Sequence, residues 1–412
     1  MKKFAFIIIS VIAVMGSRIE GQPRMPADSI ASWQSDIDYL VEKIIQIHPR
    51  YRDCGLQAEL NSAKANLRLK IGSLTDTQIV VELQKLLASV GDGHTILYPF
   101  GMKKGTLLRI PLMFWLFDDG LFVIDAPQRQ LIGQKVLSIG SLKVDELLLN
   151  LTPYISHDNN QQFLWAAPFY CTLTDFLMAA GAIKNRDSAT IVFGNNVKYS
   201  FTAKPVDPEK IEIKLIPPLN EIAPAYLMHR NDNFRVEEIR PDVLYVAVNS
   251  MNDTSQKTLE EFGKELRKLL KPYKKMVLDL RYNNGGEASK ADELFKTCVA
   301  FDVEGGKIAV LVSRMTFSAA QTFATRIDQW TSAFFVGEKT GSKPNHYGNE
   351  RQFKLPFSGL RGSISSGYNQ PVSANDSRIF ISPEIEVRVN SENFYSGKDP
   401  EIDAALNELN KY

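Results

Sequence analysis

Ser318 stands in the stretch VLVSRMTFSAAQTFATRI, where an apolar segment typical of a strand gives way to apolar residues at helical spacing. A serine that begins a helix has its hydroxyl near the positive end of the helix dipole, which favours a developing negative charge. The backbone N–H of Ala319 would point to the same place and could stabilise an oxyanion. The residue types therefore allow nucleophilic attack by Ser318, although serine at such a position is usually a plain helix N-cap.

A serine hydroxyl needs a base, and the chain has five histidines. His94 follows Gly-Asp-Gly, so a tight turn would display it as loops often display catalytic residues. His346 and Lys343, both in GSKPNHYG, compete for the role, because a desolvated lysine can also accept a proton. Taken singly, each of the three could equally be an ordinary solvated side chain.

The segment RYNNGG ends in Gly285 and Gly286, directly after the apolar run VLDL. Glycines at a strand end let backbone N–H groups point into a site, because no Cβ blocks a close approach. A plain tight turn is the alternative explanation. The chain has neither a GxGxxG fingerprint nor a Walker-type lysine motif, so this pair does not indicate nucleotide binding.

Three successive segments of the chain differ in their pattern of apolar residues, and the elements that these patterns predict would position the candidate residues. Residues 25–90 show apolar residues at steps of three and four, which predicts a helical segment ending at the His94 turn. Short apolar runs between turn signals, with a helix or two around 144–183, predict a mostly β module over about 100–205. From about residue 240 strands and helices alternate, which predicts an α/β core whose ligands bind at the carboxyl ends of parallel strands.

The N-terminus, MKKFAFIIISVIAVMGSRIEGQ, has two lysines, then an apolar stretch from Phe4 to Met15, and then the small residues Gly16 and Ser17. This layout is typical of a secretory signal peptide over residues 1–21, and the apolar stretch is too short for an ordinary transmembrane helix. An uncleaved membrane tether is the weaker alternative. We expect an exported protein, periplasmic or extracellular, with no stable membrane insertion after signal cleavage.

Composition excludes several classes of partner. The 412 residues are 44% hydrophobic, which is typical of a globular protein. Their formal net charge is +1, so the chain lacks the excess of positive charge that nucleic-acid binding would need. Its three cysteines leave at least one unpaired within the chain, and their scatter fits no metal site. We expect no nucleic-acid partner, no metal and no cofactor.

Five motifs occur in one order: SVGDGHT, VLDLRYNNGG, TFSAAQTFA, VGEKTGSKPNHYG and SGKDPEIDAAL. Together they resemble the S41 serine peptidases, the tail-specific or C-terminal processing protease family. The resemblance implies an α/β fold with a ClpP/crotonase-like catalytic core, an N-terminal helical segment and a PDZ-like β module. The implied divisions are a signal peptide (1–21), a helical segment ending in the His94 turn (25–99), the β module (100–205), a connector (206–235) and the core (236–412).

The resemblance also implies site residues, with Ser318 as the nucleophile. One branch of the family pairs the serine with a lysine, matched here by Lys343. Pro344 and Tyr347 depart from the glycine and glutamine of that branch, which weakens this match. In the implied oxyanion hole, backbone N–H groups come from Gly285, Gly286 and Ala319.

The tricorn-like branch instead uses a histidine from a DGHT-type turn, matched by His94, and an acidic residue that orients it. Asp376, in ANDSRIFISPEIEV, is the matching acid, although that branch more often has glutamate. Glu350 is a second candidate for the acid. We prefer His94, Ser318 and Asp376 over the dyad of Ser318 and Lys343.

The resemblance thus predicts an exported serine endopeptidase that acts on unfolded or C-terminally exposed polypeptides. The β module, if PDZ-like, would bind an extended peptide as an added strand. Two alternatives stay open, because fold does not fix function and nucleophile chemistry is shared. One is a non-catalytic binder of an apolar ligand, like the retinoid-binding relative of this family, and the other is an esterase or amidase.

Overall fold

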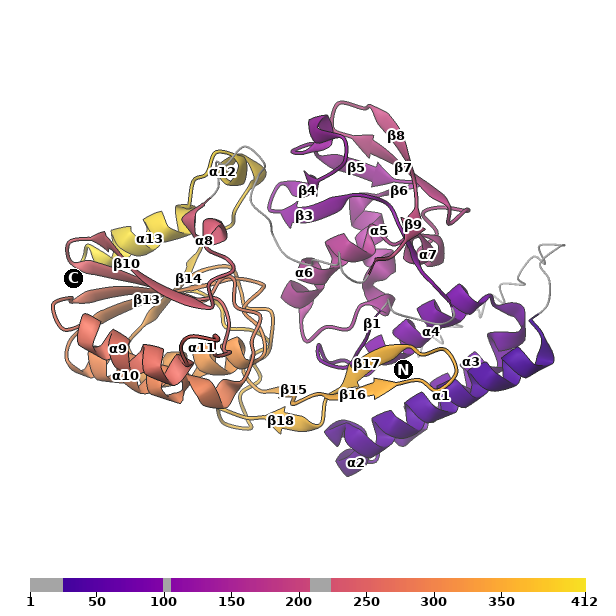
Figure 1. Cartoon of the computed structure of the whole chain (residues 1–412), viewed down its shortest axis with the longest axis horizontal. Helices are drawn as coiled ribbons and strands as arrows, with labels where there is room; N and C mark the ends of the chain where they lie inside the picture. The colour runs from indigo at the N-terminus through magenta and orange to yellow at the C-terminus, as the bar shows by residue number, and fades with distance from the viewer. Residues whose placement is uncertain (1–24, 99–104, 208–223) are drawn as a thin grey trace, which may run out of the picture.

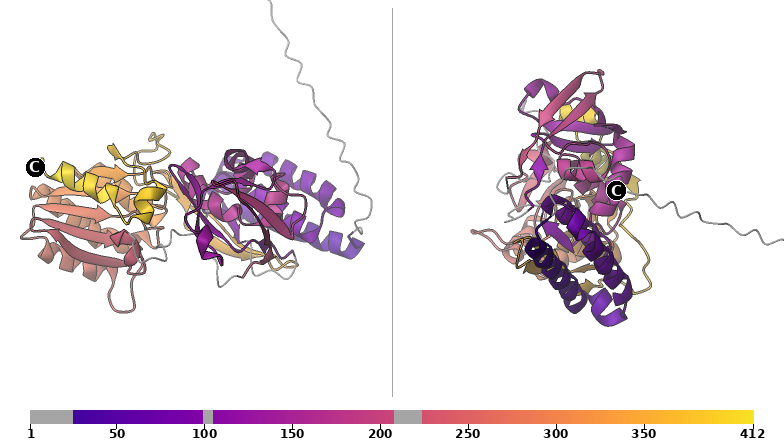
Figure 2. Two further views of the ribbon diagram at one scale, coloured as in Figure 1. Left: turned by 90° about the horizontal axis from the view of Figure 1, so that it is seen from above. Right: turned by 90° about the vertical axis from the view of Figure 1, so that its right-hand side faces the viewer.

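The structure is a computed structural model that describes residues 25–98, 105–207 and 224–412. The chain forms two lobes that lie side by side (Figures 1 and 2). The predicted signal peptide lies outside the described residues, as do residues 208–223 of the predicted connector. Among the helices that the structure describes, none is both long and apolar enough to cross a membrane.

The C-terminal lobe is built on a six-stranded sheet in the order β10-β11-β12-β13-β14-β19, parallel throughout except for the antiparallel edge strand β10. Its strands are β10 (Phe234–Arg240), β11 (Val243–Val248), β12 (Lys275–Asp279), β13 (Lys307–Val312), β14 (Phe334–Gly337) and β19 (Ile385–Glu386). Helices pack on both faces, and the central strands are buried along nearly their whole length. The predicted alternation of strands and helices is confirmed.

The helices of this lobe form two layers around the sheet (Figure 1). One face is covered by α9 (Leu259–Leu269), α10 (Asp292–Val303) and α11 (Ala319–Trp330), which share a buried apolar cluster with alternate residues of the strands. The other face is covered by α13 (Pro400–Leu409), against the remaining strand residues. Two short helices complete the lobe, α8 (Ala225–Met228) and α12 (Ser391–Tyr395).

The N-terminal lobe begins with the predicted helical segment, and its helices are α1 (Ala27–Ile47), α2 (Pro49–Cys54), α3 (Gln57–Lys70) and α4 (Asp76–Ala88). Helix α4 starts at a capping box in which Thr75 and Gln78 satisfy each other's backbone N–H groups. It ends just before the turn that carries His94. The apolar face of these helices packs into the same core as the β-rich middle of the chain.

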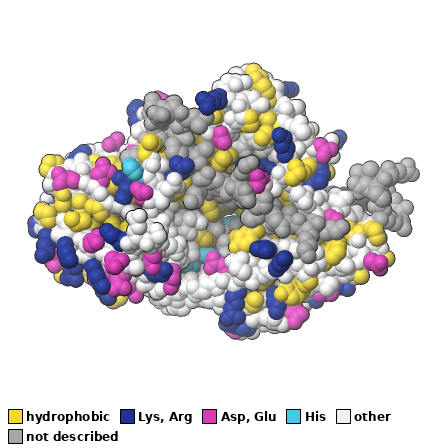
Figure 3. Space-filling view, in the orientation of Figure 1, with side chains coloured by type: hydrophobic (Ala, Val, Ile, Leu, Met, Phe, Trp, Pro, Cys, Tyr) yellow, Lys and Arg dark blue, Asp and Glu magenta, His cyan; other side chains and the backbone are white. Residues whose placement is uncertain are grey.

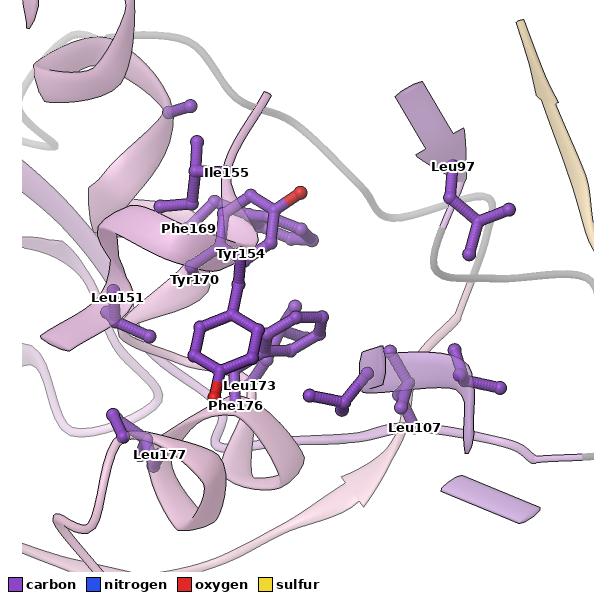
Figure 4. Packing of buried hydrophobic residues seen from close by; sticks show 14 of the residues in the cluster. Leu97, Leu107, Leu151, Tyr154, Ile155, Phe169, Tyr170, Leu173, Phe176 and Leu177 are labelled. Atoms are coloured by element: carbon purple, nitrogen blue, oxygen red, sulfur yellow. The ribbon is translucent and has the colours of Figure 1, made fainter. Parts of the chain in front are cut away.

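The middle of the chain, for which the sequence predicts a mostly β module, combines short strands with three helices. A four-stranded antiparallel sheet has the order β6-β5-β7-β8, and two-stranded ribbons pair β3 with β4 and β2 with β9. Its strands are β2 (Leu108–Arg109), β3 (Met113–Phe117), β4 (Gly120–Asp125), β5 (Val136–Ile139), β6 (Leu142–Lys143), β7 (Ser188–Phe193), β8 (Lys198–Thr202) and β9 (Lys204–Pro205). Three helices pack among them, α5 (Val144–Leu151), α6 (Asn160–Tyr170) and α7 (Thr174–Ala179), with aromatic rings at the centre of the core (Figure 4).

A segment of the C-terminal half returns to the N-terminal lobe. Strands β16 (Arg351–Lys354) and β17 (Arg361–Ile364) form a three-stranded sheet with β1 (Ile96–Tyr98). A ribbon of β15 (His346–Gly348) and β18 (Gly367–Asn369) leads to this hairpin from the other lobe (Figure 1). Since β1 directly follows His94, the pairing fixes the turn that carries this histidine. The sequence analysis did not predict it.

Candidate active site

Ser318 lies where the loop after β13 enters α11, at the carboxyl-terminal edge of the parallel sheet. Its backbone has φ 55° and ψ −124°, a conformation that residues with a Cβ rarely adopt. Although Ser318 occupies the N-cap position of α11, its side chain makes no capping hydrogen bond. The hydroxyl is therefore held away from the helix, and the plain N-cap explanation does not describe this serine.

His94 supplies the partner of that hydroxyl. Its Nε2 lies 2.9 Å from Ser318 Oγ, although the two residues are 224 positions apart and belong to different lobes. The imidazole is almost fully buried, at 3% exposure, and stacks on the ring of Phe317 with 4.3 Å between ring centroids. A hydroxyl and an imidazole at this distance can serve as the nucleophile and base of acyl-transfer chemistry.

Asp92 holds the turn that presents His94, a role that the sequence analysis missed. One of its carboxylate oxygens accepts from the N–H of His94 at 2.7 Å and from the N–H of Thr95 at 2.9 Å. The other lies 2.9 Å from Nε2 of the buried His48, whose Nδ1 accepts from the N–H of Arg50. This leaves the proton on Nε2, so His48 donates to Asp92.

Burial opposes ionisation of Asp92, but the hydrogen bond and charge of His48, together with the Thr95 and His94 interactions, outweigh it. They lower the pKa of Asp92 to about 2. The acid therefore carries a negative charge in the turn of His94 at neutral pH. Its position two residues before the histidine in the Gly-Asp-Gly-His turn is the sequence signal that could have identified it.

Asp92→Asn is expected to lower the free energy of unfolding at neutral pH by about 2 kcal/mol, because asparagine has only one acceptor oxygen and leaves either His48 Nε2–H or the N–H groups of the turn without a partner. Since the folded-state pKa of Asp92 lies below its ordinary value, its stabilisation is present above pH ~4 and is lost as the pH falls toward 2. Urea unfolding measured from neutral to acid pH should therefore show a steeper acid loss for wild type. The exposed ion-pair variant Asp53→Asn should behave as wild type, and equal acid slopes for wild type and Asp92→Asn would contradict this prediction.

The loop after β12 brings a glycine pair against Ser318. A Cβ built on Gly285 would lie only 2.7 Å from Ser318 Cβ and 3.2 Å from the backbone nitrogen of Ala319. The N–H of Gly285 donates to Asn283 Oδ1 at 2.9 Å, so it is already engaged. Within the described ranges, the N–H groups of Gly286 and Ala319 have no acceptor. Of the three predicted oxyanion donors, these two are therefore available, and Gly285 provides the space beside the nucleophile.

Gly285→Ala is expected to lower kcat by about 100-fold or more, because its methyl group would displace Ser318 and cover the N–H of Ala319. The matched control is Gly305→Ala. Gly305 also has a positive φ, +87° against +106° for Gly285, but nothing lies within 4 Å of its Cβ position. Peptide hydrolysis and melting temperature should be measured on both variants. Similar kcat values for the two would show that crowding at Ser318 has no role.

The structure does not bring Asp376 to His94. All side-chain hydrogen bonds of Asp376 go to Arg378, at 2.9 to 3.1 Å, and Arg378 also pairs with Asp328. Hydrogen bonds from Arg378 lower the pKa of Asp376, against a small opposing effect of burial. The second candidate, Glu350, is exposed. The predicted acidic orienter therefore has no counterpart at the ring of His94 in the described part of the chain.

Of the competing bases, His346 begins β15 and Lys343 lies in the loop before it. Lys343 is half-buried and contributes its backbone carbonyl, which lies 3.0 Å from Nδ1 of His346. No hydrogen bond connects the Lys343 side chain with Ser318 among the described residues, whereas His94 makes that contact directly. His346 is buried beside His94 with its ring nearly parallel, at 11° and 5.8 Å between centroids.

Other chemistries find little support. Cys171 and Cys298 are buried free thiols, and burial raises the pKa of each to about 12, so neither is a thiolate nucleophile at neutral pH. Over residues 25–98, 105–207 and 224–412, no group of three His, Cys, Asp or Glu side chains could hold a metal ion.

The face drawn in Figure 3 mixes lysine and arginine with acidic side chains and shows a hollow between the lobes.

Comparison with known proteins agrees with this geometry. The model of peptidase family S41 matches residues 242–304, a segment that includes Gly285 and Gly286. No curated protein sequence matches the chain.

Among solved structures, mature CPAF complexed with lactacystin has a TM-score of 0.67 at 13% identity, covering 93% of this chain and 99% of that one. A second structure of mature CPAF has a TM-score of 0.59 at 12% identity, covering 92% and 96%. The photosystem II D1 C-terminal processing protease matches at 14% identity, covering 89% and 98%, with a TM-score of 0.41. The likeness to CPAF shows that the fold is shared over nearly the whole of both chains.

Over residues 242–304 the sequence is therefore similar to peptidase family S41, and the fold is similar to that of mature CPAF.

Proposed function

We propose that the protein is an exported endopeptidase that cleaves unfolded or C-terminally exposed polypeptides through Ser318 and His94. The observation that carries the proposal is the 2.9 Å contact between His94 Nε2 and Ser318 Oγ. The backbone of this serine is strained, and its hydroxyl makes no capping hydrogen bond to α11. His94 takes the hydroxyl proton as Ser318 attacks the peptide carbonyl and then gives it to the leaving amine. The N–H groups of Gly286 and Ala319 receive the oxyanion.

Space for a polypeptide beside the nucleophile supports this proposal. A cavity of about 470 Å³ opens next to Gly285 and Gly286. Its remaining lining is almost entirely polar: Arg230, Asn231, Asn233, Asn249, Ser250, Asn252, Tyr282 and Asn284. Amide side chains and a single cation at its wall suit the repeated donors and acceptors of an extended peptide backbone better than they suit an apolar ligand.

The β module offers a way to hold the rest of the substrate. Strand β8 is an edge strand of the four-stranded sheet within the described residues, and most of its side chains are exposed or half-buried. An extended peptide could add to such an edge through main-chain hydrogen bonds, as in PDZ domains. The signal-like N-terminus would place this activity in a periplasm or outside the cell.

The test uses protein that begins near Gln22, incubated with casein and separately with a panel of p-nitrophenyl esters. Ser318→Ala measures the background. We expect wild type to release peptides from casein, identified by mass spectrometry, while the variant does not. Ester hydrolysis without casein cleavage would instead indicate an esterase. Neither activity, together with no reaction of Ser318 toward a fluorophosphonate, would favour a non-catalytic binder.

A further inference from the structure

Two ring nitrogens beside the nucleophile are buried without a hydrogen-bond partner among the described residues. They are Nδ1 of His94 and Nε2 of His346. Both side chains are nearly inaccessible, at 3% and 2% exposure. Buried polar atoms are satisfied by protein or by ordered water in the great majority of cases, so a pair of unsatisfied atoms in one place calls for an explanation.

The proton states of the two rings are complementary. His94 Nε2 must accept the proton of Ser318, so its single proton in the neutral state sits on Nδ1, which is a donor. Nδ1 of His346 lies 3.0 Å from the carbonyl of Lys343 and donates to it, which leaves Nε2 of His346 as an acceptor. One unsatisfied donor therefore stands near one unsatisfied acceptor.

The missing side chain of Gly348 leaves a position that lies near both rings. A Cβ built there would lie 2.7 Å from Asn369 Nδ2, 3.9 Å from Cε1 of His94 and 3.9 Å from Cδ2 of His346, and each of these two carbons is bonded to the unsatisfied nitrogen of its ring. The rings are nearly parallel with centroids 5.8 Å apart, and their unsatisfied nitrogens make no direct hydrogen bond, so one intervening water could connect them. Pairing of β15 with β18 holds His346 and Gly348 in place.

We propose that His346 is a positioning residue for the general base, and that it orients His94 through a water bound between His94 Nδ1 and His346 Nε2. This inference rests on the proposed function. The water accepts from His94 and donates to His346, so the productive tautomer of His94 is the one that satisfies both rings. His346 thereby takes the place that an acidic side chain occupies in a Ser-His-acid triad, while Asp92 supplies the negative charge through the turn.

A neutral orienter must stay an acceptor at the working pH. Burial lowers the pKa of His346, the Asp158 carboxylate opposes this effect, and His94 adds to it. His346 is therefore neutral near pH 7, and its Nε2 keeps its lone pair. Because a water-bridged neutral ring stabilises the imidazolium less than a carboxylate would, its loss should cost less than loss of the base itself.

The decisive variant is His346→Phe, which keeps a ring of similar shape but removes the acceptor. We expect kcat to fall about 10- to 100-fold with KM nearly unchanged, and the acidic limb of the pH profile of kcat/KM to move to lower pH, because protonated His94 loses a hydrogen-bond acceptor. His346→Gln, which can offer an amide oxygen, should recover part of the loss. The matched control is His157→Phe, since His157 Nδ1 also contacts a backbone carbonyl, that of Ile155, but lies outside the site.

A second readout does not depend on activity. In protein labelled with ¹⁵N-histidine, His94 should show a protonated Nδ1 and an unprotonated Nε2 in wild type and in His157→Phe, and a mixture of tautomers in His346→Phe. A wild-type kcat and pH profile in His346→Phe, or equal losses in the Phe and Gln variants with an unchanged tautomer, would overturn the inference. An inactive wild type would instead refute the proposed function, and the tautomer measurement would still test the role of His346.

Discussion

Ser318→Ala is expected to abolish casein cleavage, with a loss of at least about 10⁴-fold in kcat, because among the described residues no other hydroxyl makes a hydrogen bond to the imidazole of His94. The oxyanion donors and the substrate cavity remain in this variant, so substrate binding should survive. The measurement is peptide release from casein by mass spectrometry, with binding of a casein-derived peptide followed by calorimetry.

The control for this change is Ser332→Ala, which removes an exposed serine just past the other end of α11. It should leave turnover unchanged. Turnover in Ser318→Ala within 10-fold of wild type would exclude Ser318 as the nucleophile. Loss of turnover accompanied by a much lower melting temperature in Ser318→Ala alone would point to a structural role for the hydroxyl.

His94→Ala is expected to lower kcat by about 10²- to 10⁴-fold, since the proton of Ser318 then has no acceptor within hydrogen-bond distance in the described part of the chain. The remaining activity should rise with pH, because hydroxide can partly replace the missing base. Casein cleavage measured from pH 6 to pH 10 would show both effects.

Two further variants make this result specific. His229→Ala removes an exposed histidine outside the site and should retain full activity. Lys343→Ala should also retain most activity, because the Lys343 side chain makes no hydrogen bond to Ser318 among the described residues. If Lys343→Ala were inactive and His94→Ala active, the enzyme would instead use a Ser–Lys dyad.

Much of the fold follows from the sequence, for a clear physical reason. Runs such as VLYVAV and KIAVLVS are apolar on both faces, which only a strand covered on both sides can bury, and amphipathic helices separate them. The return of β16 and β17 to the N-terminal lobe could not be read in the same way. RQFK, which is β16, has a single buried side chain, and β1, the strand that pairs with β17 of this hairpin, lies more than 250 residues before β17.

The candidate site was predictable in its central pair and less so around it. Ser318 was indicated by its place between an apolar strand and a helix, and His94 by its place in a glycine-containing turn. The order of the motifs along the chain linked the two residues. Motif matching placed an acid at Asp376 because it could not show that Arg378, two residues later, would take both of its oxygens. In the same way, nothing in RYNNGG showed that the Asn283 side chain would occupy the N–H of Gly285.

The most direct test of the account is covalent labelling of the nucleophile. Wild type, His94→Ala and Lys343→Ala would be treated with a fluorophosphonate, and the modified residue located by peptide mass spectrometry. The account predicts one label per chain, on Ser318, in wild type and in Lys343→Ala, with labelling at least about 100-fold slower in His94→Ala. Labelling at another residue, no labelling of folded wild type, or equal rates with and without His94 would contradict it.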